Sequence, residues 1–280
     1  MPEVTIFIEI FQPFAQYRNP FTFYYAQTYP LPPKSTIIGM LQNACDDWYG
    51  HKFGIENWWA LKVSVHGGFE SVFWNYQQLI KGELGLTEGG VWINRHDKNP
   101  GGNVWLPLYG RRITSQRSPI YQQELFNGHL YIFIKGEEKL IKKIKEAIEK
   151  PGKILYLGRS EDVIFIRSIK EVKPDNTVLV QGDIKLTYPT YLSLKNFPIK
   201  NKKYPIYSIP VKVIFENNGR NVKHKSEITK STERKIEFEP IIYTGYNYSI
   251  ILPENYSLNV EFYTISDKEE IRIIHPSGWL

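Results

Sequence analysis

The chain of 280 residues is long enough to bury one large core or two modest ones, and its apolar content of 42% is ordinary for a globular protein. Its 35 basic and 29 acidic residues give a net charge of +6, an excess that favours a polyanionic partner without specifying a fold. A single cysteine excludes an intrachain disulfide, and no apolar run approaches the roughly 20 residues of a membrane-spanning helix. The N-terminal residues lack the features of a signal peptide, so we expect a cytoplasmic protein without membrane contact.

Aromatic content and local charge both indicate a binding protein. Aromatic residues make up 15% of the chain, with 19 Tyr and 7 Trp, which is more than a core needs. Residues 170–235 hold fourteen Lys or Arg against six Asp or Glu, so the basic character is local. Stacking rings and a local basic surplus are typical of nucleic-acid binding, and a solvated lysine-rich face is the alternative that the charges leave open.

The N-terminal part alternates between strand and helix patterns. Residues 4–11, "VTIFIEIF", have the period of two that predicts a strand. Residues 12–33 form a Pro- and Tyr-rich excursion that is too irregular for a tight turn. A helix follows and is expected to end at Gly50. Its apolar residues form one stripe, which consists of Ile37, Ile38, Leu41, Ala44, Cys45 and Trp48.

The middle of the chain continues this alternation around an insertion. Strands are expected at 60–66, with an extension through "FESVFWNY", and at 129–136. Between them "VWI" and "VWL" flank a turn-rich tip and predict a hairpin, in which Trp92 and Trp105 could pair. An amphipathic helix at 137–150 leads to a further strand, or two, within 153–169.

This order of elements predicts an α+β fold. Strand-helix-strand, an inserted hairpin, then strand-helix-strand is the ferredoxin-like (RRM-like) split arrangement, an antiparallel sheet with two helices on one face. The other face would be free to bind RNA. From about residue 176 the pattern changes to short strands separated by Pro and Asn, which predicts a β-rich C-terminal lobe with a polar loop at 216–235.

The segment "LPPKSTIIGML", residues 31–41, puts a positive charge and two hydroxyls at the start of the first helix. A hydroxyl at the N-cap satisfies free amides of the first turn, which accounts for Ser35 or Thr36 but not for Lys34. A cation there opposes the helix dipole unless an anion is bound. Two interpretations stay open: plain helix capping, and a phosphate site.

No motif of nucleotide hydrolysis, dinucleotide binding or serine hydrolysis occurs in the sequence. The histidines and the lone cysteine lack ligand spacing. Adjacent acids, such as Asp46–Asp47 and Glu161–Asp162, point apart on regular elements. We therefore expect no metal and no cofactor.

Metal-free RNA cleavage requires neither a metal site nor one of these motifs, because His, Tyr or Lys can act as its acid and base. His51–Lys52 and Lys223–His224–Lys225 are the nearest candidates in the sequence. Exposed loop positions are the simpler interpretation of both.

Two segments carry a resemblance to a known family. "FTFYYAQTYPLPPKSTIIGML" at 21–41 and "LYLGRSEDV" at 155–163 resemble the N-terminal region and mid-chain signature of the fifth CRISPR-associated (Cas) protein family. These are RAMP-superfamily subunits of type I CRISPR effector complexes. The similarity covers roughly residues 1–170 and looks like the type I-B kind.

The resemblance implies both an architecture and a function. It implies a ferredoxin-like palm at 1–175 with a β-hairpin thumb inserted at about 82–118, followed by the β-rich lobe at 176–280. Such subunits grip the 5′ repeat-derived handle of the crRNA and contact the backbone and large subunits of the complex. A non-catalytic role in an antiviral surveillance complex of the Cascade kind is therefore expected, with no small-molecule substrate.

One branch of that family, the type I-C kind, also cleaves repeat RNA with a Tyr, Lys and His set. The present sequence has no Lys-His pair at the expected mid-chain position. For this reason a metal-independent endoribonuclease is the alternative function and not the main expectation. Under the main expectation, Arg159 lies near the phosphate site and the arginines at 111–117 form an arm on the thumb. The residues expected to bind RNA are Lys34, Ser35, Thr36, Arg111, Arg112, Arg117 and Arg159.

Overall fold

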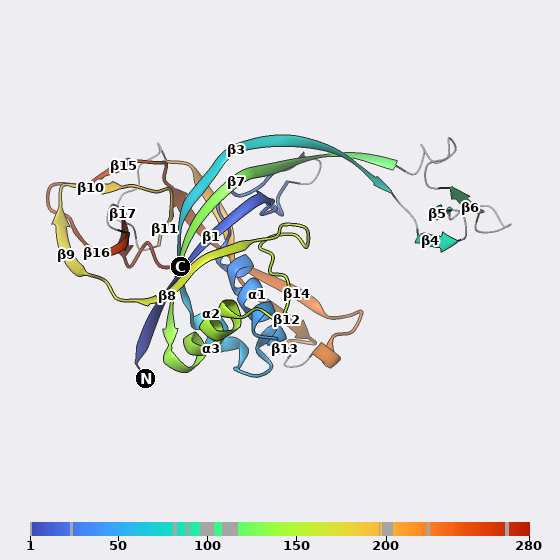
Figure 1. Ribbon diagram of the computed structural model, residues 1–280, viewed down its shortest axis with the longest axis horizontal. Helices are drawn as coiled ribbons and strands as arrows, with labels where there is room; N and C mark the ends of the chain where they lie inside the picture. Colours follow the sequence, from blue (N-terminus) through green and yellow to red (C-terminus); the bar gives the residue numbers. More distant parts are fainter. Residues whose placement is uncertain are drawn as a thin grey trace.

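The computed structural model of the chain is an α+β protein built mostly of strands (Figure 1). No described helix is long and apolar enough to cross a membrane. Side chains are described throughout except at 78–95, 104–107, 117–118 and 225. The structure describes residues 2–22, 25–80, 83–87, 90–95, 104–107, 117–195, 197, 204–222, 225–266 and 269–280.

Four strands that are far apart in the sequence form the central sheet. β1 (Glu3–Ala15) lies between β7 (Arg117–Glu137) and β8 (Phe165–Val172), while β3 (Lys62–Ile80) pairs with the other side of β7. All three pairings are antiparallel, and the short β2 (Tyr25–Ala26) joins β7 in parallel. The strand order is therefore β3-β7-β1-β8, with a helix in each of the connections β1–β3 and β7–β8.

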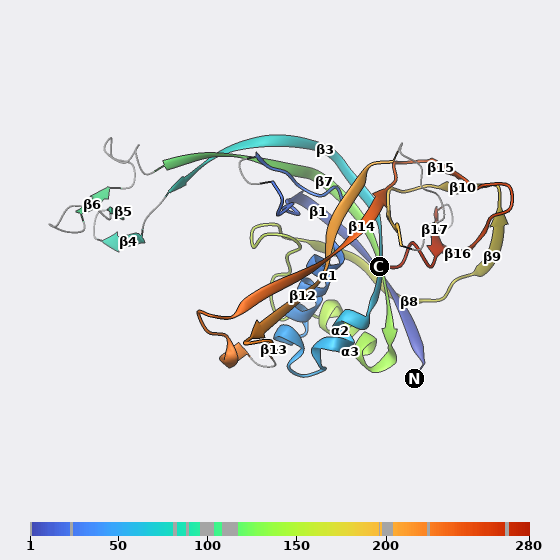
Figure 2. The ribbon, with the colours of Figure 1, turned by 180° about the vertical axis from the view of Figure 1, so that it is seen from behind.

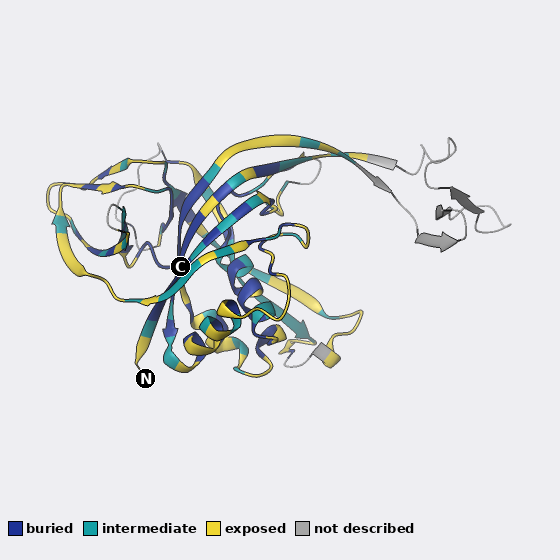
Figure 3. Ribbon diagram, viewed as in Figure 1, coloured by how far each residue is buried: buried dark blue, intermediate teal, exposed yellow. Residues whose placement is uncertain are grey.

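One face of this sheet is covered by helices. The alternation predicted for the first strand is present, because Ile6, Ile8 and Ile10 are all fully buried against helices α1 (Lys34–Ala44) and α3 (Glu138–Glu149). The helix α2 (Ile55–Ala60) precedes β3. These apolar faces place the main core between sheet and helices (Figure 3).

The opposite face of the sheet is only partly open, which corrects the expectation of a free face. Phe7 of β1 and Phe133 of β7 are buried beneath β16 (Ser257–Ser266) and β17 (Glu269–His275), where Tyr263 packs 4.8 Å from the Phe133 ring. The C-terminal strands thus cover the part of the face around Phe7 and Phe133, which an RRM-like sheet would expose.

Past the body of the sheet, β3 and β7 continue as a ribbon, which the end of β1 and the short β2 still join as far as Tyr121 and which is two-stranded from Gln77↔Ile120 outward. Their register runs unbroken from Ser71↔Phe126 to Ile80↔Arg117. At its far end β4 (Glu83–Thr87), β5 (Gly90–Arg95) and β6 (Val104–Pro107) form a small antiparallel sheet (Figure 1). The expected hairpin between "VWI" and "VWL" is present as β5 and β6, but Trp92 pairs with Pro107 and Trp105 with Asn94, so the two tryptophans are not opposite one another.

The C-terminal part is rich in strands, as its pattern predicts. A long hairpin lies beside α1 (Figure 2) and is made of β12 (Ile206–Asn217) and β14 (Glu233–Tyr243). Between these two strands lie β13 (Arg220–Asn221) and the 3-10 turn Lys225–Glu227. The remaining strands are β9 (Asn176–Gln181), β10 (Asp183–Leu186), β11 (Tyr191–Ser193) and β15 (Tyr248–Ile251).

Two expected boundaries are wrong for local reasons. The first helix ends at Ala44 instead of continuing to Gly50, since Asp46 adopts a positive φ of 50° and Trp48 belongs to a separate 3-10 turn, Trp48–Gly50. Residues 153–164 form no long strand. They make a turn closed by the bridge Tyr156↔Val163, and β8 begins only at Phe165.

Candidate nucleic-acid interface

The "LGRSED" segment forms a tight turn that is fastened to the end of β1. Asp162 is 1% exposed and its Oδ2 accepts hydrogen bonds from the backbone amides of Gln16 (3.0 Å) and Arg159 (2.9 Å). Gln12 donates from Nε2 to the carbonyl of Leu157 at 2.7 Å. The pairing of β1 with β8 ends at Phe11, and beyond it these contacts hold that edge of β1 instead. The segment is thus a structural fastening of the sheet.

Arg159 is the centre of this fastening. Its guanidinium donates to Asp162 from Nη2 at 2.8 Å and to Glu124 of β7 from Nη1 at 2.8 Å, and it also reaches Gln122 at 3.3 Å. Both carboxylates are nearly buried, so the pairs are shielded from water. The guanidinium therefore has partners within the chain, and RNA contact by Arg159 stays a prediction.

Lys34 also has a partner within the chain. It is the first residue of α1, and its ammonium donates a hydrogen bond of 3.1 Å to the carbonyl of Trp59, in the last turn of α2. A cation at the C-terminal end of a helix is favourable, so the charge that opposes one helix dipole supports another. Burial lowers the pKa of Lys34 to about 8, opposed by Glu239 and aided by Lys212.

Ser35 and Thr36 do not cap the helix, which corrects the capping interpretation. The N-cap residue is Pro33, and no side chain caps α1. The two hydroxyl residues lie in the first turn and line a pocket of about 330 Å³ together with Gly158 and Arg234. The structure thus brings the two motifs of the sequence side by side, although it leaves the Arg159 guanidinium and the Lys34 ammonium with other partners.

The predicted arginine arm cannot be placed as a whole. Arg111 and Arg112 lie outside the described residues. Arg117 is the first residue of β7, paired with Ile80, and only its backbone is described. Phosphate contact by these three residues therefore stays a prediction.

The strongest binding feature of the described residues is one that the sequence did not single out. We call the segments 71–77 of β3 and 119–127 of β7, together with Phe14 and Tyr25, the aromatic ribbon. Phe73 and Trp74 are neighbours in a strand, so their side chains point to opposite faces. Both faces of the ribbon therefore carry aromatic rings, and both are exposed (Figure 3).

On one face of the ribbon the Phe14 ring lies 6.5 Å from that of Phe73 and 5.2 Å from that of Phe126. On the other face Tyr25 lies 6.1 Å from Trp74 and 6.0 Å from Tyr121. Trp74 is 48% exposed. A cluster of exposed aromatic rings is characteristic of an interaction site, because apolar surface in contact with water is unfavourable and a binding partner would cover it.

The ribbon is also nearly free of charge. Segments 71–77 and 119–127 contain one side chain that is charged at neutral pH, Glu124, and Arg159 neutralises it. The remaining polar groups there are amides and hydroxyls, such as those of Asn75 and Gln123. A neutral surface of rings and amides is suited to the faces and edges of nucleobases.

A smaller cluster continues the aromatic surface onto the open end of the sheet. Phe11 of β1 pairs with Phe165 of β8, with ring centroids 6.1 Å apart, and with His129 of β7 at 5.2 Å. The Arg167 guanidinium lies 5.1 Å from the centre of the Phe11 ring, and Phe165 is 50% exposed. This is the part of the face that β16 and β17 leave uncovered.

The acids and histidines considered for chemistry have structural roles where they are described. Asp47 accepts from the indole of Trp58 at 2.7 Å, whereas Asp46 pairs with Lys153, so the adjacent acids do point apart. His66 is buried, which lowers its pKa to about 3, and its Nε2 lies 2.9 Å from Ser64 Oγ.

Lys223 and His224 lie outside the described residues, as does the side chain of Lys225. His51 follows the turn Trp48–Gly50 and lines a surface pocket with Tyr49 and Ile55. Within the described part of the chain, no group of three or more His, Cys, Asp or Glu is arranged to hold a metal ion.

The sequence itself now assigns the chain to a family. Residues 5–247 match the family described as CRISPR-associated protein (Cas_Cas5). The chain belongs to this family. No curated protein matches it.

Three solved structures are similar over most of their length. One is described as a CRISPR RNA-guided surveillance complex, with 13% identity, a TM-score of 0.48, and coverage of 88% of this chain and 91% of that chain. A Cas protein crystal structure has 15% identity, a TM-score of 0.40 and coverage of 89% and 95%. A CRISPR protein from Archaeoglobus fulgidus has 11% identity, a TM-score of 0.38 and coverage of 96% and 98%.

Proposed function

We propose that this CRISPR-associated protein is a non-catalytic crRNA-binding subunit of a type I effector complex, and that it grips the 5′ repeat-derived handle. The aromatic ribbon is the observation that carries the proposal. It offers rings on two faces, amides for base edges and no unpaired charge along its described side chains. The type I-B assignment stays a prediction from sequence.

In this proposal the sheet β3-β7-β1-β8 with α1 and α3 is a ferredoxin-like palm. The far end of the β3–β7 ribbon, with β4, β5 and β6, is the thumb. The handle would follow the ribbon toward the open end of the palm at Phe11 and Phe165. The backbone and large subunits would then meet the chain around the bound handle.

Two kinds of contact with RNA are separable by their salt dependence. Stacking on an aromatic ring contributes about 1–3 kcal/mol per base and releases no counterions. Each phosphate contact adds about −0.7 to the slope of log affinity against log salt for a single strand. The neutral ribbon should therefore add affinity but no slope, whereas Arg111, Arg112 and Arg117 should add slope.

The test is the affinity of the purified chain for its handle RNA at several salt concentrations. Trp74→Ala should weaken binding by about 5- to 150-fold with an unchanged slope, and Trp74→Phe should restore most of it. Ile251→Ala removes an apolar side chain on β15 that is even more exposed than Trp74, and as the control it should bind like the parent. Unchanged affinity of Trp74→Ala and of a Phe14→Ala, Phe73→Ala double variant would remove the basis of the proposal.

The alternative, repeat-RNA cleavage, is tested by incubating the chain with its repeat RNA in EDTA. The proposed function predicts intact RNA after prolonged incubation. A discrete product ending in a 2′,3′-cyclic phosphate would replace it with a metal-independent endoribonuclease.

A further inference from the structure

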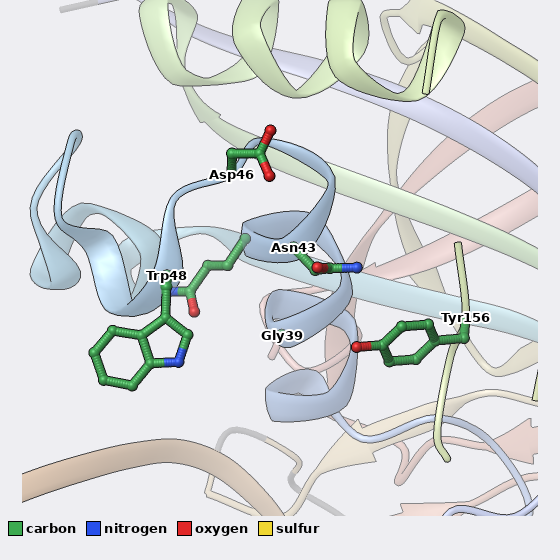
Figure 4. Close-up of a pocket in the computed structure, with 6 residues that line it drawn as sticks. Gly39, Asn43, Asp46, Trp48 and Tyr156 are labelled. Carbon is green, nitrogen blue, oxygen red and sulfur yellow. The ribbon is translucent and has the colours of Figure 1, made fainter. Parts of the chain in front are cut away.

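A groove runs along the outer side of α1 and is made of two adjoining pockets. One, of about 380 Å³, is lined by Gln42, Asn43, Trp48 and Asp46, whose carboxylate is paired with Lys153 (Figure 4). The other is the pocket of Ser35 and Thr36. Gly39 and Tyr156 line both pockets, so the two adjoin at these residues.

The first pocket has the side chains of a base site. Trp48 and Tyr156, 39% and 37% exposed, stand on its two sides, with Asn43 between them (Figure 4). Gln42 is only 9% exposed, and its Nε2 has no hydrogen-bond partner among the residues that the structure describes. Burying an amide N–H without an acceptor is unfavourable, and an acceptor on a ligand would offset that cost.

Gly39 forms the floor of the groove at the point where the pockets meet. It lies in the middle of α1, where glycine is less favourable for the helix than alanine. A Cβ added there would meet no atom within 4 Å, so packing within the chain does not require glycine. The residue keeps the floor open at the expense of helix stability.

The second pocket offers groups for an anion. The hydroxyls of Ser35 and Thr36 lie at the N-terminal turn of α1, and the Arg234 guanidinium of β14 lines the same pocket. Seven residues separate these hydroxyls from Gln42 and Asn43, which is about 10 Å along a helix. One nucleotide reaches over such a span.

We propose that this groove binds a single nucleotide, with its base between Trp48 and Tyr156 and its phosphate at Ser35, Thr36 and Arg234. The Gln42 amide donates to an acceptor on the base edge. The nucleotide is a residue of the bound RNA or a free mononucleotide, and the inference rests on the proposed function only for the first of these sources.

Calorimetric titration separates the two ends of the groove. Adenosine and uridine 5′-monophosphates should bind with dissociation constants in the millimolar range, roughly −4 kcal/mol. Arg234→Ala should lower the affinity for a monophosphate to that for the nucleoside, without changing nucleoside binding. Gln42→Met should weaken both.

Filling the groove is the decisive change. Gly39→Leu should abolish mononucleotide binding while the melting temperature stays equal or rises, since leucine favours the helix. Gly39→Ala improves the helix and fills little, so it should bind like the parent. Mononucleotide binding by Gly39→Leu at parental affinity would overturn the proposal.

Measuring the affinity of the same variant for handle RNA identifies the source of the nucleotide. If Gly39→Leu also loses at least about 10-fold in handle affinity, which is about 1.4 kcal/mol, the nucleotide belongs to the RNA. If mononucleotides bind but the handle does not, the groove stands and the proposed function fails. If Gly39→Leu binds nucleotides normally but no longer assembles with partner subunits, the groove is a protein-docking site and the proposal is wrong.

Discussion

Replacing Lys34 by methionine should change how stability depends on pH. Lys34 keeps its hydrogen bond to Trp59, but burial lowers its pKa from 10.5 to about 8. Between these two values the unfolded chain binds more protons than the folded one, so this group makes stability rise with pH. The full shift corresponds to roughly 3 kcal/mol at about 1.36 kcal/mol per unit.

Most of this free-energy cost, which comes from burying the charged Lys34 ammonium, is present at neutral pH. It decreases as the pH rises toward 10.5, because the folded protein can lose the proton of Lys34 more easily than the unfolded chain. Relative to Lys34→Met, the parent should gain roughly 2 kcal/mol of unfolding free energy between pH 7 and pH 9.5. At pH 7 the variant also loses the hydrogen bond to the Trp59 carbonyl, worth about 1.5–3 kcal/mol for a charged donor. The two proteins should therefore be of similar stability there.

The assay is urea-induced unfolding at pH 7 and pH 9.5, followed by tryptophan fluorescence. Other groups titrate in this range, and burial raises the pKa of Cys45 to about 12, which has the opposite effect on stability. These groups are common to both proteins and cancel in the difference. Parallel pH profiles of parent and variant would refute the reasoning.

The same variant tests the phosphate interpretation of Lys34, because a loss of handle affinity of about 10-fold or more without loss of stability would show direct contact. Arg159→Gln should cost about 3–5 kcal/mol in urea unfolding, since it leaves the buried carboxylates of Asp162 and Glu124 without their cation; a loss below about 1 kcal/mol would show that the fastening is not structural. Gly158→Ala should lower the melting temperature, because its φ is 113° and a Cβ would meet Asp162 Oδ2 at 2.8 Å; an unchanged value would contradict this. Gly39→Ala should raise unfolding free energy by about 0.5–1 kcal/mol, and a decrease would mean that the floor of the groove is packed.

The order of the main elements could be predicted because local pattern determines it. The alternation in 4–11, the amphipathic period in 137–150 and the strand-like run after Leu61 correspond to β1, α3 and β3. The end of the first helix could not, because its apolar stripe continues past Ala44 to Trp48. Only the positive φ of Asp46 and the buried hydrogen bonds of Asp47 end it there.

The site was harder to predict, because its charges have partners that are far away in the sequence. Lys34 reaches Trp59, and Arg159 reaches Glu124, contacts that no motif spacing encodes. The ribbon was detectable in part, since "VFWNY" and the 15% aromatic content are visible in the sequence. That its rings remain exposed follows only from the two strands leaving the body of the sheet together.

Ligand binding should stabilise the outer part of the aromatic ribbon, because few strand contacts hold it in place. Beyond Tyr76 and Tyr121 each strand pairs only with the other among the described residues, so these amides depend on a two-stranded ladder that is marginal by itself in water. Their hydrogen exchange should therefore proceed through local opening, far faster than that of Ile132 in the central sheet. A ligand that binds only the closed ribbon slows this exchange in proportion to its occupancy. Amide exchange at 77–80 and at residues 117, 118 and 120 thus reports binding even where no side chain there touches the ligand.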